Sequence, residues 1–529
     1  MSSRRGEIAM TVRRLRAWGI LPLAVVGTAA LGVAPALTPV LVPGLAAAKT
    51  VVAEAALLDT ESWIMGGSGL PIPPPSYLTA LSERYINPSA YPDFNNGQPS
   101  FIGQPTFPVS TDNVNPLFTP EGLYPFTGVK NLELDTSAQQ GVSILNSTIT
   151  NQVAAGNPLV VLGYSQSATI SSLEMKDLLA MPQDQQPTAE QLAFVLLGDP
   201  SNPNGGLLSR FDFTSLPTVG DKLPELTVPS LGITFSGATP AGTPWDTAIY
   251  SQEYDGFADF PKYPLNFLAD LNALLGILEI HGNYPSLTAD QIGTSILLPG
   301  SADNPAELPD GSTTAADATN YYMIPTHDLP LLDLIRGSSF GNAIADLLQP
   351  DLKIMIDMGY GNLDTPADLA NGTGGWDTGP ANLPTPFGLA PPVDSSALMT
   401  ALSNGAQQGM TAFTSDLSHM STTVTDAVTN GATTTALPSL TDIVNAFSGG
   451  LSSLYSALLP TADITNALVT TLPTYDFDLF SQYLSAGDLQ DALGMPAAFT
   501  TGLTTLAAGF ELIAIENAFS GFTSEFSGL

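Results

Sequence analysis

A strand-like run that turns sharply at a serine and continues as a helix is the feature that most restricts the fold of this 529-residue chain. The apolar residues 159–162 lead into Gly163-Tyr164-Ser165-Gln166-Ser167, and a helical pattern follows over 168–179. A G-x-S-x-[G/S] turn between strand and helix holds a serine hydroxyl above the edge of a sheet. The helix N-terminus favours negative charge developing there. We therefore predict that Ser165 is an acyl-accepting nucleophile.

A serine nucleophile needs a base, and the chain contains only three histidines. In α/β hydrolases the order along the chain is serine, acid, histidine. His281 follows a helix predicted over 265–278 and is the favoured base. His327 also follows a strand-like run, over 320–324, and stays an alternative base. His419 lies in a C-terminal helical segment, where we expect a surface or packing residue.

The acid that orients the base is expected at the carboxyl end of a strand. Asp255 follows a strand predicted over 247–253 and is favoured. Asp199 follows a strand predicted over 193–197 and is the alternative acid. However, Asp199 precedes a proline, and such an aspartate commonly hydrogen-bonds within its own turn. Asp259 ranks third.

Two backbone N–H groups are candidates for an oxyanion hole, which stabilises the negative oxygen of an acyl intermediate. Gln166, the residue after the nucleophile, supplies one. Ser68, in the turn Gly67-Ser68-Gly69, supplies the other. We predict no metal and no cofactor, since the histidines are far apart in the chain and there is no H-E-x-x-H motif.

Alternating strands and helices predict an α/β fold, with a parallel sheet covered by helices on both faces. We assign this domain to residues 55–390, with a Pro-rich connection over 71–125 and a hairpin insertion over 216–244 that forms a lid or acyl-chain wall. A helical extension over 395–529 follows. Its helices are predicted over 395–430, 440–459, 477–493 and 497–520.

Charge and composition restrict location and partners. Arginines precede an uncharged apolar stretch within residues 1–48, which predicts a signal peptide or N-terminal membrane anchor and hence export. The chain has no cysteine, so its fold contains no disulfide. The formal net charge is −35, and no Lys or Arg follows Lys353. Nucleic acid is therefore excluded as a partner, and electrostatic adsorption to anionic lipid is disfavoured.

Several further blocks, taken with the serine turn, resemble the PE-PPE domain, a cutinase-like serine α/β-hydrolase domain of mycobacteria. They are Gly66-Gly67-Ser68-Gly69, Gly198-Asp199-Pro200, Tyr254-Asp255-Gly256-Phe257-Ala258-Asp259-Phe260-Pro261, His281-Gly282-Asn283-Tyr284 and Tyr321-Tyr322-Met323-Ile324-Pro325-Thr326. The resemblance implies an α/β-hydrolase fold and a triad of Ser165, Asp255 and His281. The small PE or PPE domain that often precedes this module is not found, and the resemblance does not explain the helical extension.

These features together predict an exported serine esterase or lipase that acts on acyl esters, with cell-envelope lipids as substrates and an association with the envelope or its membrane. An acyltransferase using the same acyl-enzyme chemistry is the alternative within enzymes. A non-catalytic envelope interaction protein on a hydrolase scaffold is the alternative of another class.

Overall fold

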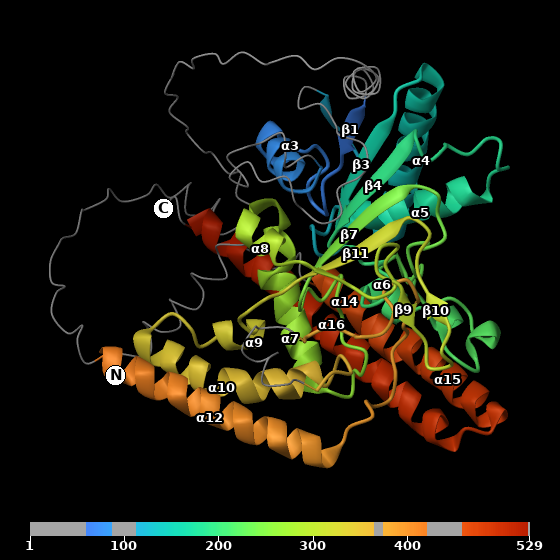
Figure 1. The fold of residues 1–529 in the computed structure, drawn as a ribbon. Coiled ribbons are helices and arrows are strands. Elements are labelled where there is room, and N and C mark those ends of the chain that lie inside the picture. Colours follow the sequence, from blue (N-terminus) through green and yellow to red (C-terminus); the bar gives the residue numbers. More distant parts are fainter. Residues whose placement is uncertain (1–59, 87–112, 364–373, 421–457, 527–529) are drawn as a thin grey trace, which may run out of the picture.

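A seven-stranded sheet forms the centre of the computed structural model, which describes residues 60–86, 113–363, 374–420 and 458–526 (Figure 1). The strand order is β2-β1-β3-β4-β7-β11-β8. The strands are β1 (Glu61–Ile64), β2 (Val114–Pro116), β3 (Leu159–Tyr164), β4 (Leu192–Leu197), β7 (Asp246–Gln252), β8 (Ile296–Leu297) and β11 (Thr319–Ile324). All pairs are parallel except β11 with the short edge strand β8. The predicted α/β class is confirmed.

Both faces of the sheet are buried, because alternate side chains of each strand enter different apolar clusters. Leu159 and Val161 of β3 pack with helices α4 (Leu134–Ala155) and α5 (Gln166–Ala180). Val160 and Leu162 pack on the other face with α3 (Pro75–Leu81), the π-helical turn η2 (Ser82–Ile86), the 3₁₀ segment η6 (His281–Ser286) and α8 (Ala289–Gly293). This double covering explains why β3 and β4 are apolar at almost every position.

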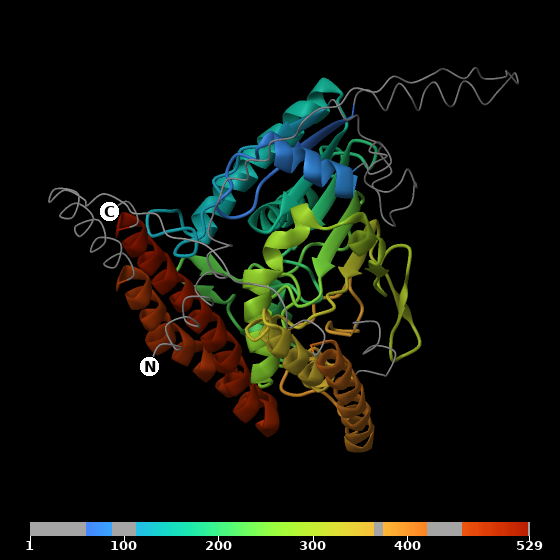
Figure 2. The same ribbon diagram turned by 90° about the vertical axis from the view of Figure 1, so that its left-hand side faces the viewer.

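A third apolar cluster joins the sheet domain to the C-terminal helices. These are α14 (Leu458–Asn466), the π-helical turn η7 (Ala467–Thr471), α15 (Leu472–Ala486) and the long α16 (Leu489–Phe526). They pack with α6 (Leu207–Arg210), the hairpin β5–β6 (Thr227–Val228 and Ile233–Thr234) and α7 (Phe267–Glu279). Figure 2 shows α15 and α16 running side by side along the domain.

A second pair of helices lies next to α7: α10 (Ser339–Asp357) and α12 (Ser395–Met420), with the short α9 (Pro330–Asp333) beside them (Figure 1). A small two-stranded sheet, β9 (Ala306–Glu307) with β10 (Thr313–Thr314), and two 3₁₀ segments, η4 (Phe213–Ser215) and η5 (Gly220–Lys222), complete the regular structure described. The assigned boundaries at residues 390 and 395 stay a prediction. Helices α14, α15 and α16 nevertheless share a core with the sheet domain, and α12 packs against α10.

Two element predictions are wrong. The connection over 71–125 contains α3, η2 and the edge strand β2 within its described part. The last two helices are separated at Gly487, where the backbone is left-handed (φ 84°), rather than near residues 494–496. Glycine adopts this conformation without steric cost and ends α15 there, whereas Gly494 and Pro496 lie inside α16.

The predicted signal segment, residues 1–48, and most of the helix predicted over 440–459 lie outside the described residues. Among the described residues, Leu489–Ile515 of α16 is apolar and long enough to span a membrane by length and composition. Half of its most apolar stretch is buried inside the protein.

Candidate active site

Ser165 stands at the apex of the turn between β3 and α5, with φ 59° and ψ −119°. This conformation is rare for a residue with a side chain, and such strain is typical of functional turns. Gly163 allows the tight turn, because a Cβ on it would lie 2.5 Å from the Ser167 carbonyl oxygen. Ser167 fixes the turn with its hydroxyl, which accepts a hydrogen bond from the Tyr164 N–H at 2.8 Å.

Three of the predicted site residues meet at the carboxyl edge of the sheet. His281 Nε2 lies 2.7 Å from Ser165 Oγ, and His281 Nδ1 lies 2.8 Å from each carboxylate oxygen of Asp255. Asp255 follows β7, and His281 follows α7, so one strand–helix unit carries both. Asp255 is fully buried, while Ser165 and His281 are 7% and 8% exposed. A proton can therefore pass from Ser165 Oγ to an imidazole that a buried carboxylate orients.

The Asp255 carboxylate has two further donors. The Tyr284 hydroxyl donates to Oδ2 at 2.8 Å, and the Phe257 N–H donates to Oδ1 at 3.1 Å. Gly198 (φ 53°) leaves room for this arrangement, since a Cβ there would lie 2.9 Å from the Tyr284 ring and 3.1 Å from His281 Cε1. These contacts hold the carboxylate in one orientation toward the imidazole.

Aromatic rings enclose His281. The Tyr164 ring stacks on the imidazole with centroids 5.3 Å apart, and the Tyr164 hydroxyl donates to the His281 carbonyl oxygen. Phe257 meets the imidazole edge-on at 4.8 Å. The roles of Tyr284, Tyr164 and Phe257 were not predicted from the sequence. All three stand within three residues of a triad member, but that proximity does not distinguish them from ordinary core aromatics.

The alternative residues lie elsewhere. The His327 side chain is 75% exposed, and its nearest described acid is Asp328, at 3.8 Å. The Asp199 carboxylate accepts from the Ser201 N–H at 2.9 Å and from the Thr239 hydroxyl at 2.6 Å. It is therefore held by its own turn and by the 216–244 insertion. Burial raises its pKa to about 6. His419 falls near the end of α12.

Asp259, the third candidate acid, supports the backbone beside the site. It is buried, and it accepts the Tyr254 N–H at 3.0 Å, at a residue whose φ is 67°. Burial raises its pKa well above the usual range. Asp259 therefore stabilises the corner that carries Asp255 and makes no described hydrogen bond to the imidazole.

Gln166 and Ser68 both line the cavity that contains Ser165. Gln166 is the first residue of α5, so its N–H is one of those that have no acceptor within the helix. Its side chain is fixed by a closed set of hydrogen bonds. Gln166 Nε2 donates to the Gly122 carbonyl at 2.6 Å, the Gly122 N–H donates to Ser137 Oγ at 2.8 Å, and Ser137 Oγ donates to Gln166 Oε1 at 3.2 Å.

The turn at Ser68 is held close to Ser165. A Cβ on Gly67 would lie 3.0 Å from the Tyr164 ring and 3.2 Å from Ser165 Cβ, which is tighter than most side-chain contacts, so glycine favours this close approach. The next residue, Gly69, donates its N–H to the Glu121 carbonyl at 2.7 Å. Burial raises the pKa of Glu121 to about 8. Within the described residues, no cluster of three or more His, Asp or Glu side chains is placed to hold a metal ion.

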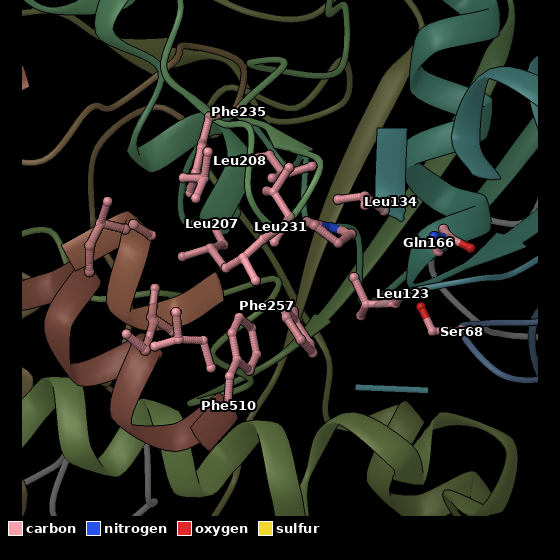
Figure 3. Close-up of a pocket in the computed structure, with 18 of the residues that line it drawn as sticks. Ser68, Leu123, Leu134, Gln166, Leu207, Leu208, Leu231, Phe235, Phe257 and Phe510 are labelled. Carbon is pink, nitrogen blue, oxygen red and sulfur yellow. The ribbon is translucent and has the colours of Figure 1, made fainter. Parts of the chain in front are cut away.

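An apolar cavity that is partly open to solvent lies beside Ser165. Its polar lining residues are few: Ser68, Ser165, Gln166 and Thr169. In Figure 3, Ser68 and Gln166 lie on one side of the cavity, and Phe235 and Phe510 lie on the other. Phe235 follows the β5–β6 hairpin, and Phe510 belongs to α16.

Residues 110–361 match the PE-PPE domain family. The chain is 38% identical over 506 residues to the uncharacterized PPE family protein PPE28 of Mycobacterium tuberculosis, covering 91% of this chain and 69% of that protein. Esterase PE16 of the same organism is 40% identical over 64% of this chain and 55% of its own length. SL1278 acyltransferase Chp1 is 27% identical over 57% of this chain and 66% of its own length. No solved structure matches the chain.

Proposed function

The chain belongs to the PE-PPE domain family, and from this premise we propose that it is a serine esterase or lipase that acts on acyl esters of lipids. The observation that carries the proposal is the chain of hydrogen bonds from Ser165 through His281 to Asp255, placed beside an apolar cavity. The relatives named esterase PE16 and acyltransferase Chp1 support the same chemical class. They share only part of their length with this chain.

In the first step Ser165 Oγ attacks the ester carbonyl carbon, and His281 Nε2 takes the hydroxyl proton. The carbonyl π bond opens, and its electron pair moves onto the oxygen. His281 Nδ1–H donates to Asp255, which selects the tautomer whose Nε2 can accept and stabilises the imidazolium that forms.

The negative oxygen of this intermediate is stabilised by the N–H groups of Gln166 and Ser68. Donors held in position before the reaction need no reorganisation when the charge develops. The closed hydrogen-bond set around the Gln166 side chain and the tight packing of Gly67 supply that rigidity.

Collapse of the intermediate breaks the bond to the alcohol oxygen, which takes the proton from His281 Nε2. Ser165 is left acylated. A second hydroxyl then attacks the acyl carbon and passes its proton to His281 Nε2. The Ser165 Oγ–acyl bond breaks, and Ser165 Oγ takes that proton back from His281. Water in this step gives hydrolysis. A sugar or lipid hydroxyl gives acyl transfer.

Covalent labelling by a fluorophosphonate probe tests the proposal. The wild type should be labelled and should hydrolyse p-nitrophenyl butyrate, and Ser165→Ala should lose the label and at least about a thousandfold of the turnover. Ser143→Ala is the matched control, because this serine is exposed on α4 and bonds only its own helix among the described contacts. Folded wild type that is not labelled would instead favour a non-catalytic interaction protein on a hydrolase scaffold.

Acyl transfer is the second candidate, favoured by the relatives named acyltransferases Chp1 and Chp2. Products of one long-chain ester should be compared with and without a trehalose acceptor. A new acylated sugar that disappears in Ser165→Ala would assign transfer. Free acid alone at every acceptor concentration would assign hydrolysis.

Export completes the proposal and rests on residues 1–48, where arginines precede an apolar stretch. The protein would then act in the cell envelope. The N-terminal sequence of the protein recovered from the culture medium and from the envelope fraction tests this. Protein found only in the cytosol would contradict export.

A further inference from the structure

We infer that the C-terminal helices form one wall of an acyl-binding tunnel, so that α16 and η7 set the length of acyl chain that Ser165 accepts. The inference rests on the proposed function, because it concerns the substrate of the same site. It assigns the helical extension a role in specificity, and it names the substrate class as esters of long hydrocarbon chains.

The wall is built from one continuous face of α16. Leu503, Leu506, Ala507 and Phe510 all line the cavity, and they are spaced three, one and three residues apart. This spacing places them on a single face of an α-helix. The neighbouring Ala508 is exposed, so its side chain lies outside the cavity.

A second part of the wall comes from the segment before α15. Ile464 of α14, Ala467 and Leu468 of η7, and Leu472 at the start of α15 also line the cavity. The β5–β6 hairpin region supplies the opposing side of the cavity with Val228, Leu231, Ile233 and Phe235. The hairpin predicted as an acyl-chain wall is therefore one half of the enclosure, and the extension is the other half.

The wall is fixed to the domain by polar contacts. The Tyr124 hydroxyl donates to the Asp463 carboxylate at 2.6 Å, and the Ser230 hydroxyl donates to the Asp463 carbonyl at 2.9 Å. The Tyr475 hydroxyl accepts the Thr227 N–H at 3.0 Å. Both sides of the cavity are thus bonded to each other, and its width is set by packed structure.

The chemistry of the lining selects a hydrocarbon. No charged side chain lines the cavity among the residues that the structure describes, and its polar residues include Ser68, Ser165 and Gln166, which belong to the site of reaction. A carbonyl held at Ser165 would direct its chain away from those groups and along Leu, Ile and Phe side chains. Such a surface favours displacement of water by an apolar chain.

A ring contact connects the far wall with the catalytic base. Phe126 packs edge-on against Phe510 at 6.4 Å and against Phe257 at 6.5 Å. Phe257 in turn meets the His281 imidazole at 4.8 Å. The wall formed by α16 therefore belongs to the same packed unit as the triad.

A pair of neighbouring substitutions tests the inference. Ala507→Trp places an indole in the cavity, whereas Ala508→Trp places it in solvent one residue away on the same helix. We expect the ratio of kcat/KM for p-nitrophenyl laurate to that for p-nitrophenyl butyrate to fall about tenfold or more in Ala507→Trp. Ala508→Trp should keep the wild-type ratio. Leu468→Trp, on η7, should lower it as Ala507→Trp does.

Binding measured without catalysis separates this inference from the proposed function. Ser165→Ala protein should bind a fluorescent dodecanoic acid analogue, and the added Ala507→Trp substitution should weaken that binding about tenfold relative to added Ala508→Trp. Equal binding in the two double variants, with both folded by thermal melting, overturns the tunnel. Normal binding in a wild type that is never labelled by fluorophosphonate would overturn the proposed function and leave the tunnel standing.

Discussion

At the scale of single residues, the Asp255 carboxylate depends on one hydroxyl outside the predicted triad. The Tyr284 hydroxyl donates to Asp255 Oδ2 and accepts the Gln252 N–H, each at 2.8 Å. Gln252 ends β7, so this hydroxyl connects the strand end to the acid. Tyr284 touches neither Ser165 nor the expected position of the ester, and we regard it as a positioning residue.

Tyr284→Phe should therefore lower kcat/KM for a short ester roughly tenfold or more, because a hydrogen bond to a charged group is worth about 1.5–3 kcal/mol. The loss should fall on kcat, with KM nearly unchanged. Tyr77→Phe is the matched control, since the Tyr77 hydroxyl is buried and has no hydrogen-bond partner among the described residues. Equal kinetics for the two variants would remove the positioning role.

At the scale of elements, helix α10 stabilises the turn that follows β7 through contacts made by Lys353. Lys353 Nζ of α10 lies 3.1 Å from Glu253, 2.6 Å from Asp357 and 2.6 Å from the Tyr254 hydroxyl, and both acids are fully buried. Burial raises the pKa of Glu253 to about 6, and the neighbouring ammonium group opposes that rise. Glu253 also accepts the N–H groups of Thr326 and Gly375, so it joins three segments beside Asp255.

Lys353→Met should cost about 3–5 kcal/mol of unfolding free energy, because it leaves two buried carboxylates without their cation. Urea denaturation at neutral pH measures the loss, and the exposed Lys222→Met serves as the control. The deficit relative to wild type should shrink as the pH falls, since protonation removes the uncompensated charges. A deficit that grows in acid would contradict this explanation.

At the scale of the whole molecule, glycines of α16 form the seam between the extension and the sheet domain. A Cβ on Gly494 would lie 2.3 Å from Leu389, one on Gly502 would lie 2.7 Å from Phe211, and one on Gly509 would lie 2.1 Å from Leu274. The helix therefore packs closely along the domain, and Phe499 adds ring contacts with Phe213 at 5.1 Å. Domain and extension share one apolar core across this seam.

A shared core predicts one cooperative unfolding transition in calorimetry for both parts. Gly502→Val should lower the stability of the whole by about 1–3 kcal/mol, since overpacking a close contact strains both sides. Thr504→Val, at an exposed position of the same helix, is the control. Two separate transitions, with only the weaker one moved by Gly502→Val, would show that the extension folds as an independent module.

Local sequence patterns predicted the sheet strands and the candidate site residues better than they predicted the residues that enclose the cavity. The β3 run and the Ser165 turn have local signatures, and chain order led to Asp255 and His281. The wall formed by Leu506 and Phe510 has none, because contacts more than 300 residues from the nucleophile depend on tertiary packing. The end of α15 was misplaced since glycine alone does not mark a helix end: Gly487 is left-handed, whereas Gly494 continues α16.

The position of Phe257 connects binding of the acyl chain with the reaction at the ester. One ring both lines the cavity and packs against the imidazole of His281. An acyl chain that filled the cavity would therefore contact the ring that packs against this imidazole. Binding energy gained far from the ester can offset the free-energy cost of orienting the reacting atoms. A well-fitting acyl chain should then raise the turnover of the bound ester as well as its affinity.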